Sequence, residues 1–337
     1  MDMDAARAVL DDLLELLVVP SFTTIGFRVR RRLFGWPDVE SLSMAGRTVV
    51  ITGATSGLGR EAAGSFARMG ASLVLVGRDR ARLERTRGEL VAEGGGTVET
   101  VVADMSSLPS VRAAADEILD AVPRIDVLVD NAGAMYPTRE VSADGIEMSV
   151  ATMVVGPYVL IGRLWPRLAD SPDGRIVAVS SGGMYAQRLP LDDLGYEHDA
   201  YHGARAYARA KRAQVALMRE WVRRLRAHGI VANAMHPGWA DTPGLEASLP
   251  GFRSLIGGLL RSPAEGADTI VWLASAPEAR ASSGRLFLDR RVRPFDRVPG
   301  TRLSAADRRD LWDQVVALSG ETDPTSPERR AGRPRRS

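Results

Sequence analysis

Short apolar runs alternate with longer segments of helical composition from Arg47 onward. The runs read RTVVITG, SLVLVG, TVETVVAD, IDVLVDNAG, RIVAVSS and IVANAMHPG. Each has the length and β-branched content of one strand, and strands that alternate with helices are typical of a parallel sheet covered on both faces. The sequence therefore predicts an α/β protein built on one doubly wound parallel sheet, the Rossmann fold. Its ligand is expected at the carboxyl ends of the strands.

The rest of the chain is expected to flank this sheet. Residues 1–46 form a helical and basic N-terminal extension, and residues 47–295 hold the sheet as a single domain. Residues 296–319 include a final helix with Ser304 as its N-cap, because a serine there can accept from the first turn. Residues 320–337, GETDPTSPERRAGRPRRS, are polar and rich in proline and arginine, and we expect them to be disordered.

The N-terminal extension allows two interpretations. DAARAVLDDLLELLVV has a helical apolar face ended by Pro20, and the basic stretch RVRRRLFGW follows at Arg28–Trp36. The helix could lie on an anionic membrane surface, or it could pack on the main domain with a solvated arginine face. The packed arrangement is favoured. Asp2 and Asp4 argue against a secretory signal, and LLELLVV is too short to span a membrane, so we expect a cytoplasmic protein.

The composition excludes several chemistries. A net charge of +2 gives no field for nucleic acid, and the absence of cysteine excludes disulfides, thiol catalysis and thiolate zinc sites. His198 and His202 have the spacing of one helix face. A zinc site needs a third protein ligand, and none is evident near them, so no metal site is predicted.

The stretch ITGATSGLG follows the first expected strand and opens the first helix. Gly53, Gly57 and Gly59 allow a tight turn in which backbone N–H groups and the helix N-terminus face a pyrophosphate. Arg78 lies 25 positions after Gly53, just beyond the second strand. An arginine there suits the 2′-phosphate of NADP, whereas its neighbour Asp79 would suit the ribose hydroxyl of NAD. We predict NADP, with NAD as the alternative.

Lys211 is the only lysine among the 44 lysine and arginine residues of the chain. It follows Tyr207 by four positions, so the two side chains share one face of a helix. A phenol with a pKa near 10 is a poor acid or base at neutral pH. A nearby ammonium lowers that pKa toward the working range. The alternative is a surface tyrosine beside a basic residue.

With these residues the chain resembles the short-chain dehydrogenase/reductase family. The matching motifs are TGATSGLG, NAG at 131–133, VSS at 179–181, YARAK and HPGWADT, and they occur in the family's order between Thr52 and Thr242. Within the family, IGFRVRRR, HPGWADTPG and FLDRRVRP look most like the group called dehydrogenase/reductase family member 12.

The resemblance implies an oxidoreductase that moves hydride between a nicotinamide cofactor and a carbonyl or alcohol. Tyr207 would be the general acid or base. Lys211 would lower its pKa and hydrogen-bond the nicotinamide ribose, and Ser181 would hold the substrate oxygen. The residues expected to bind the cofactor are Gly53, Thr55, Ser56, Gly57, Leu58, Gly59, Arg78, Asp104, Met105, Asn131, Ala132, Gly133, Tyr207, Lys211, Pro237, Gly238 and Thr242.

One position departs from the family pattern. In ATMVVGPYVL the family has an asparagine three positions before the glycine, and here Met153 stands there. That asparagine is thought to hold a water that relays protons through the lysine, and a thioether is at most a weak acceptor. The departure leaves a second interpretation open, a nucleotide-binding sensor or scaffold with weakened catalysis.

The segment Thr242–Pro263 is apolar and interrupted by glycines. It follows the motif expected at the nicotinamide, and it predicts a lid over a hydrophobic carbonyl or alcohol. Alternatively it packs on the domain or on a partner subunit, so an oligomer is left open. Residues 182–206 are also expected to line the pocket. The apolar residues of the lid are Leu245, Leu249, Phe252, Leu255, Ile256, Leu259 and Leu260.

Overall fold

The computed structural model describes residues 3–326 except 249–250, 252–253 and 255. Within them one eight-stranded sheet has the order β3-β2-β1-β4-β5-β6-β7-β8. β7 and β8 pair antiparallel, and every other pair is parallel. This confirms the predicted fold class. The strands are β1 (Thr48–Thr52), β2 (Ser72–Gly77), β3 (Val98–Val102), β4 (Val127–Asp130), β5 (Arg175–Val179), β6 (Val231–Met235), β7 (Leu286–Leu288) and β8 (Arg291–Arg293).

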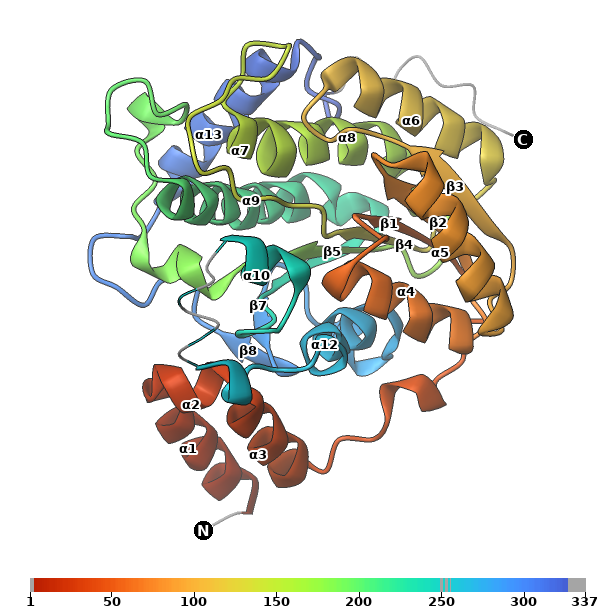
Figure 1. Cartoon of the computed structure of the whole chain (residues 1–337), viewed down its shortest axis with the longest axis vertical. Coiled ribbons are helices and arrows are strands. Elements are labelled where there is room, and N and C mark those ends of the chain that lie inside the picture. Colours follow the sequence, from red (N-terminus) through yellow and green to blue (C-terminus); the bar gives the residue numbers. More distant parts are fainter. Residues whose placement is uncertain (1–2, 249–250, 252–253, 255, 327–337) are drawn as a thin grey trace.

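Helices cover both faces of the sheet, as Figure 1 shows. Alternate residues of β1 enter different cores: Val50 packs under one layer of helices, and Val49 and Ile51 pack under the other. Two apolar faces explain why the strands read as continuous apolar runs. One layer is α4 (Gly57–Arg68), α5 (Arg80–Ala92) and α12 (Pro263–Ser275), and the other is α6 (Leu108–Ala121), α8 (Gly156–Ala169) and α9 (Gly203–Leu225), with α13 (Ala305–Ser319) packed on α9.

Shorter elements connect these layers. Met148–Ala169, which comprises α7 (Met148–Val150), the π-helical turn η2 (Ala151–Val155) and α8, has the length and apolar composition of a membrane span, and it is buried inside the domain as a core helix. As predicted, Ser304 caps α13, and its hydroxyl accepts from the backbone N–H of Asp307. Residues 320–326 contact the domain through Glu321, which pairs with Arg112 at 2.9 Å. The remaining short turns are η1 (Val39–Ser41), η3 (Gly182–Ala186), η4 (Leu191–Asp193), η5 (Arg226–His228), η6 (Gly257–Leu259), η7 (Glu278–Ala281) and the helix α10 (Pro243–Ser248).

The order of the strands reverses between β1 and β4. The chain runs outward from β1 through β2 to β3, and then from β4 outward through β5 and β6 on the other side. Loops that leave β1 and β4 therefore separate and open a crevice at their carboxyl ends. Gly53 follows β1, and Asn131 follows β4, which places both expected cofactor motifs at this crevice.

The hairpin β7–β8 was not expected from the sequence. Leu288 pairs with Arg291 across a two-residue turn in which Asp289 and Arg290 both have φ of 55°. A turn with both φ values positive matches the twist of a hairpin, but it usually carries Asn-Gly or Asp-Gly. Asp-Arg gives no such signal. This turn is instead held by ion pairs, because Arg290 contacts Asp268 at 2.8 Å.

The N-terminal extension forms three helices rather than one helix that ends at Pro20. α1 (Met3–Leu16) stops before Leu17, and α2 (Val18–Phe22) passes through Pro20 before α3 (Thr24–Phe34) begins. Pro20 is the third residue of α2, where its missing N–H interrupts no helical hydrogen bond. Figure 1 shows the three helices side by side at one end of the molecule, next to β8.

A buried ion-pair cluster fastens the extension to the domain. Arg30 of α3 is 0% exposed, and its guanidinium donates to Asp11 at 2.7 Å, Glu15 at 2.6 Å and Asp289 at 2.7 Å. Arg293 of β8 donates to Asp11 at 2.8 Å. The extension therefore packs on the domain, as the favoured interpretation predicted, but Arg30 is not part of a solvated arginine face.

Replacement of Arg30 should weaken the attachment of the N-terminal helices to the domain. Arg30→Met would leave the carboxylates of Asp11, Glu15 and Asp289 buried with fewer partners, and we expect a loss of roughly 3–5 kcal/mol in the free energy of unfolding. Urea denaturation followed by circular dichroism measures it. Arg32→Met, at an exposed position of the same helix, is the matched control. Equal stability of the two variants would contradict the account.

Candidate active site

A cleft of about 460 Å³ opens at the carboxyl edge of the sheet. This volume lies in the usual range for a small-molecule site. It brings together residues from the glycine-rich loop, the ends of β4, β5 and β6, and the first turns of α9. The sequence-predicted residues that line it are Gly53, Ser56, Gly57, Leu58, Asn131, Ala132, Gly133, Ser181, Tyr207, Lys211, Pro237, Gly238 and Thr242.

The glycine-rich loop is folded so tightly that its glycines cannot be exchanged for larger residues at two positions, Gly53 and Gly59. Gly53 has φ of +67°, a conformation that favours glycine. A Cβ on Gly59 would lie 2.3 Å from the Gly53 carbonyl oxygen. The compact loop starts α4 directly at the cleft, where the free backbone N–H groups of its first turn and the helix dipole favour an anion.

Asn131 ties this loop to β4. Its side-chain amide donates to the carbonyl oxygens of Thr52 at 2.9 Å and Gly53 at 3.3 Å. The backbone N–H groups of Asn131 and Ala132 both donate to the Thr52 hydroxyl at 3.0 Å. The side chain expected to contact the cofactor therefore also holds the two halves of the crevice at a fixed distance.

Ser181 and Tyr207 face each other in the cleft. Ser181 follows β5, and Tyr207 lies in the second turn of α9, where Ser181 hydrogen-bonds its phenol. Burial raises the pKa of Tyr207 to about 12, and the hydrogen bond from Ser181 opposes the rise. At neutral pH the phenol is therefore protonated and can donate to an oxygen in the cleft.

Lys211 does not lower the pKa of Tyr207 in the way the spacing predicts. Its Nζ donates to the carbonyl oxygen of Val179 at 2.7 Å and to Gln214 Oε1 at 3.3 Å. The same Nζ lies 5.9 Å from the centre of the Tyr207 ring. The ammonium is thus directed to the end of β5 rather than to the phenol oxygen, and burial of the phenol dominates. Burial also lowers the pKa of Lys211 itself, to about 8.

Five predicted cofactor residues lie outside the cleft. Asp104 is exposed, and its carboxylate accepts from the backbone and hydroxyl of Ser106 at 2.9 and 2.7 Å. Met105 is buried. Its carbonyl oxygen packs closely on Gly156, because a Cβ built on that glycine would lie only 2.2 Å from the oxygen. The five are Thr55, Gly59, Arg78, Asp104 and Met105.

The structure distinguishes Arg78 from its neighbour Asp79. Asp79 is the N-cap of α5, and its carboxylate accepts from the backbone N–H of Arg82 at 3.0 Å. Arg78 is exposed directly after β2. The helix cap thus engages the carboxylate that would otherwise be available to a ribose hydroxyl.

Several lining residues were missed by the sequence analysis. Trp239 lies within the HPGWADT motif, so its position was a usable signal. Phe22 of α2 supports this wall, since its carbonyl oxygen accepts from the backbone N–H of Trp239 at 2.7 Å and the two rings meet edge to face at 5.7 Å. No local pattern connects Phe22 with this wall. The other lining residues that were not predicted include Ala134, Met135 and Ala208.

The expected lid is described only in part. Pro243, Gly244 and Leu245, at the start of α10, line the cleft. Leu260 is buried, and the bridge between Ala240 and Arg261 ties the end of the segment to the cleft wall. Leu249, Phe252 and Leu255 lie outside the described residues. Of residues 182–206, which were also expected at the pocket, Gly183 and Ala204 line it.

The two histidines do not share a helix face. α9 begins at Gly203, with His202 as its N-cap residue, and His198 lies in the preceding irregular segment. The helical spacing was therefore coincidental. Across the described part of the chain, no group of three or more histidine, cysteine, aspartate or glutamate side chains could hold a metal ion.

The fold agrees with comparison to known proteins. Residues 47–250 match the family model described as short chain dehydrogenase, so the chain belongs to that family. It is an oxidoreductase that acts on CH–OH or C=O groups with a nicotinamide cofactor. The predicted resemblance to the member 12 group is also confirmed. Dehydrogenase/reductase SDR family member 12 of Bos taurus is 41% identical over 261 residues, which cover 77% of this chain and 81% of the relative.

Two further similarities cover most of this chain. Retinol dehydrogenase 14 of Homo sapiens is 35% identical over 341 residues, which cover 95% of this chain and 99% of the relative. The 3-ketoacyl-(acyl-carrier-protein) reductase of Brucella melitensis, solved in complex with NADH, is 29% identical with a TM-score of 0.59. That match covers 72% of this chain and 96% of the solved chain.

Proposed function

We propose that the chain is an NADP-dependent reductase or dehydrogenase of apolar carbonyl and alcohol substrates, with Tyr207 as general acid or base. The observation that carries this proposal is the meeting of Ser181, Tyr207 and Lys211 in one cleft with the glycine-rich loop. Family membership gives the reaction class, and these side chains give the roles within it.

A bound nicotinamide would supply or accept the hydride. The glycine-rich loop and the first turn of α4 would hold its pyrophosphate. Ser181 and Tyr207 would both hydrogen-bond the substrate oxygen, and the protonated phenol would donate its proton as a carbonyl is reduced. Lys211, charged below a pH of about 8, would stabilise the phenolate that is left.

The substrate class is inferred from the cleft wall. Large apolar side chains contribute to the lining of the cleft beside Ser181 and Tyr207, and they include Met135, Trp239 and Leu245. A wall of this kind stabilises a hydrophobic body next to two polar groups that orient one oxygen. A lipid-like, steroid-like or retinoid-like alcohol or carbonyl fits this description, and one relative carries the name retinol dehydrogenase.

The exchange of Tyr207 for phenylalanine tests the assigned chemistry. Tyr207→Phe keeps the ring and removes the proton donor, so kcat/KM should fall by at least roughly 100-fold. The measurement is NADPH oxidation with a panel of apolar aldehydes and ketones, alongside Lys211→Arg. NADPH affinity in Tyr207→Phe, measured by fluorescence, is the control for an intact site. Full activity in that variant would refute the mechanism.

The preference for NADP rests on Arg78. A guanidinium can donate charge-assisted hydrogen bonds to a 2′-phosphate, and Asp79 is engaged as a helix cap. Arg78→Ala should weaken NADPH binding by roughly ten- to 100-fold and leave NADH binding nearly unchanged. Arg80→Ala, an exposed arginine two residues further, is the matched control. Equal loss of both cofactors, or of neither, would contradict the preference.

A second candidate function is a nucleotide-binding sensor or scaffold. Met153 favours it, because this fully buried thioether stands where the family pattern has an asparagine. Tight NADPH binding without turnover on any substrate of the panel, unrepaired by Met153→Asn, would support the sensor and exclude the reductase.

We also propose that residues 1–46 bring the catalytic domain, residues 47–295, to an anionic membrane surface at its cytoplasmic side. α1 and the residue that links it to α2 expose apolar side chains, among them Leu13 at 55%, Leu16 at 77% and Leu17 at 60%. Arg28, Arg31 and Arg32 are exposed on α3. Apolar side chains beside arginines are typical of a helix that lies at a lipid headgroup layer.

Vesicle flotation tests the membrane proposal. The whole chain should bind phosphatidylserine-containing vesicles and bind pure phosphatidylcholine vesicles weakly, and Leu13→Asp with Leu16→Asp should abolish binding. Val91→Asp places one carboxylate at an exposed apolar position of α5, away from the extension, and should leave binding unchanged. Binding that survives the paired substitution would refute the proposal.

A further inference from the structure

Met153 occupies the place beside the catalytic lysine where a polar group is expected. It is fully buried in the π-helical turn η2, a local widening that often marks functional sites. A Cβ built on Gly133 would lie 3.2 Å from Met153 Sδ and 3.3 Å from Lys211 Nζ. The sulfur and the ammonium therefore flank the same glycine, and the sulfur is at most a weak acceptor.

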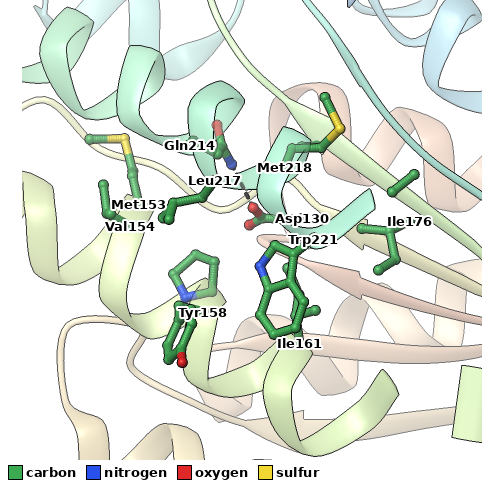
Figure 2. A pocket seen from close by; sticks show the side chains of 13 residues that line it. Asp130, Met153, Val154, Tyr158, Ile161, Ile176, Gln214, Leu217, Met218 and Trp221 are labelled. Atoms are coloured by element: carbon green, nitrogen blue, oxygen red, sulfur yellow. Dashed lines mark hydrogen bonds between the residues drawn. The ribbon is translucent and has the colours of Figure 1, made fainter. Parts of the chain in front are cut away.

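Two other buried polar side chains lie next to Lys211. Gln214 follows it by three positions on α9, and Asp130 is the last residue of β4. Gln214 Nε2 donates to Asp130 Oδ2 at 2.6 Å, as Figure 2 shows, and Gln214 Oε1 accepts from Lys211 Nζ at 3.3 Å. Since Asp130 is 3% exposed and Gln214 is 4% exposed, this chain of hydrogen bonds is shielded from solvent.

A small cavity adjoins Asp130, the residue at the end of this series of hydrogen bonds. Its volume is about 20 Å³, enough for one water molecule, and Asp130, Met153, Gln214 and Tyr158 are among its lining residues (Figure 2). Asp130 Oδ1 is buried and has no hydrogen-bond partner among the described residues. Asp130 Oδ1 can therefore still accept a hydrogen bond, and the cavity beside it has room for a donor such as a water molecule.

The charges of Lys211 and Asp130 depend on one another. Burial lowers the pKa of Lys211 to about 8, and the Asp130 carboxylate raises it against that effect. Burial raises the pKa of Asp130 to about 6, while Lys211 and Gln214 oppose the rise. Both groups are therefore charged between about pH 6 and pH 8. Tyr207 lies near Lys211, and Tyr158 of α8 lines the same cavity as Asp130, while η2 contributes no titratable side chain.

We propose that Asp130 and Gln214 are positioning residues that hold Lys211 in its charged form, next to the position where Met153 stands instead of the family asparagine. Asp130 supplies the counter-charge, and Gln214 links it to the ammonium. This proposal rests on the proposed function only through the catalytic role of Lys211.

The single lysine allows a direct test. In protein labelled with ¹³C-lysine, one Cε resonance reports the titration of Lys211, whether or not a substrate is known. Asp130→Asn removes the counter-charge with little change of shape. It should lower the midpoint of that titration by at least about one pH unit. Gln214→Met, which breaks the link and keeps the carboxylate, should lower it as well and serves if Asp130→Asn does not fold.

Asp126→Asn is the matched control. Asp126 is a buried carboxylate directly before β4, where it accepts from the backbone N–H of Thr48 at 2.8 Å at the opposite end of the strand. This variant should leave the titration of Lys211 in place. An unchanged midpoint in Asp130→Asn and Gln214→Met, or an equal change in Asp126→Asn, would overturn the proposal.

The pH profile of kcat/KM gives the second measurement. Activity falls as Lys211 loses its proton, so the alkaline limb should move to lower pH in Asp130→Asn, by the same amount as the resonance. A limb that stays in place while the resonance moves would show that Lys211 does not act in catalysis. That result would refute the proposed function and leave the structural role of Asp130 intact.

Discussion

The buried ammonium of Lys211 is the constraint that the catalytic end of this protein must satisfy. Removal of an ammonium from water costs several kcal/mol unless partners compensate. Here the compensation comes from the Val179 carbonyl oxygen, from Gln214 and, through Gln214, from Asp130. Asp130 pairs with Ala178 across neighbouring parallel strands, which brings the ends of β4 and β5 under the same face of α9. The sheet register therefore fixes the electrostatics of the lysine.

The same edge of the sheet also connects the cleft to the N-terminal helices. Arg261 donates to Asp289 at 2.8 Å and to the Ser21 carbonyl oxygen at 2.8 Å, and the Phe22 carbonyl oxygen accepts from Trp239 in the cleft wall. The N-terminal helices, which we propose to meet lipid, and the wall of the substrate cleft are therefore both held by contacts around Arg261 and Asp289.

The sequence predicted those parts of the fold that local patterns encode. Short apolar runs that alternate with helical segments identified β1 to β6, and the spacing of Tyr207 and Lys211 placed both on one helix face. Prediction from the sequence failed where a side chain is held by residues that are distant in the sequence. The spacing suggested that Lys211 acts directly on the phenol, but the end of β5 takes its hydrogen bond. Asp130 and Gln214 lie 84 positions apart, and Arg30 and Asp289 lie 259 apart, so no local pattern predicts either contact.

The central claim is that hydride passes between nicotinamide and a carbonyl carbon in the cleft of Tyr207 and Lys211. Isotope transfer tests it most directly. With NADPH deuterated at the reactive carbon and an apolar ketone or aldehyde, mass spectrometry should find one deuterium on the carbinol carbon of the alcohol. Transfer from the deuterated cofactor should nearly vanish when Tyr207 is replaced by phenylalanine. An alcohol product without deuterium, or undiminished transfer in that variant, would contradict the account.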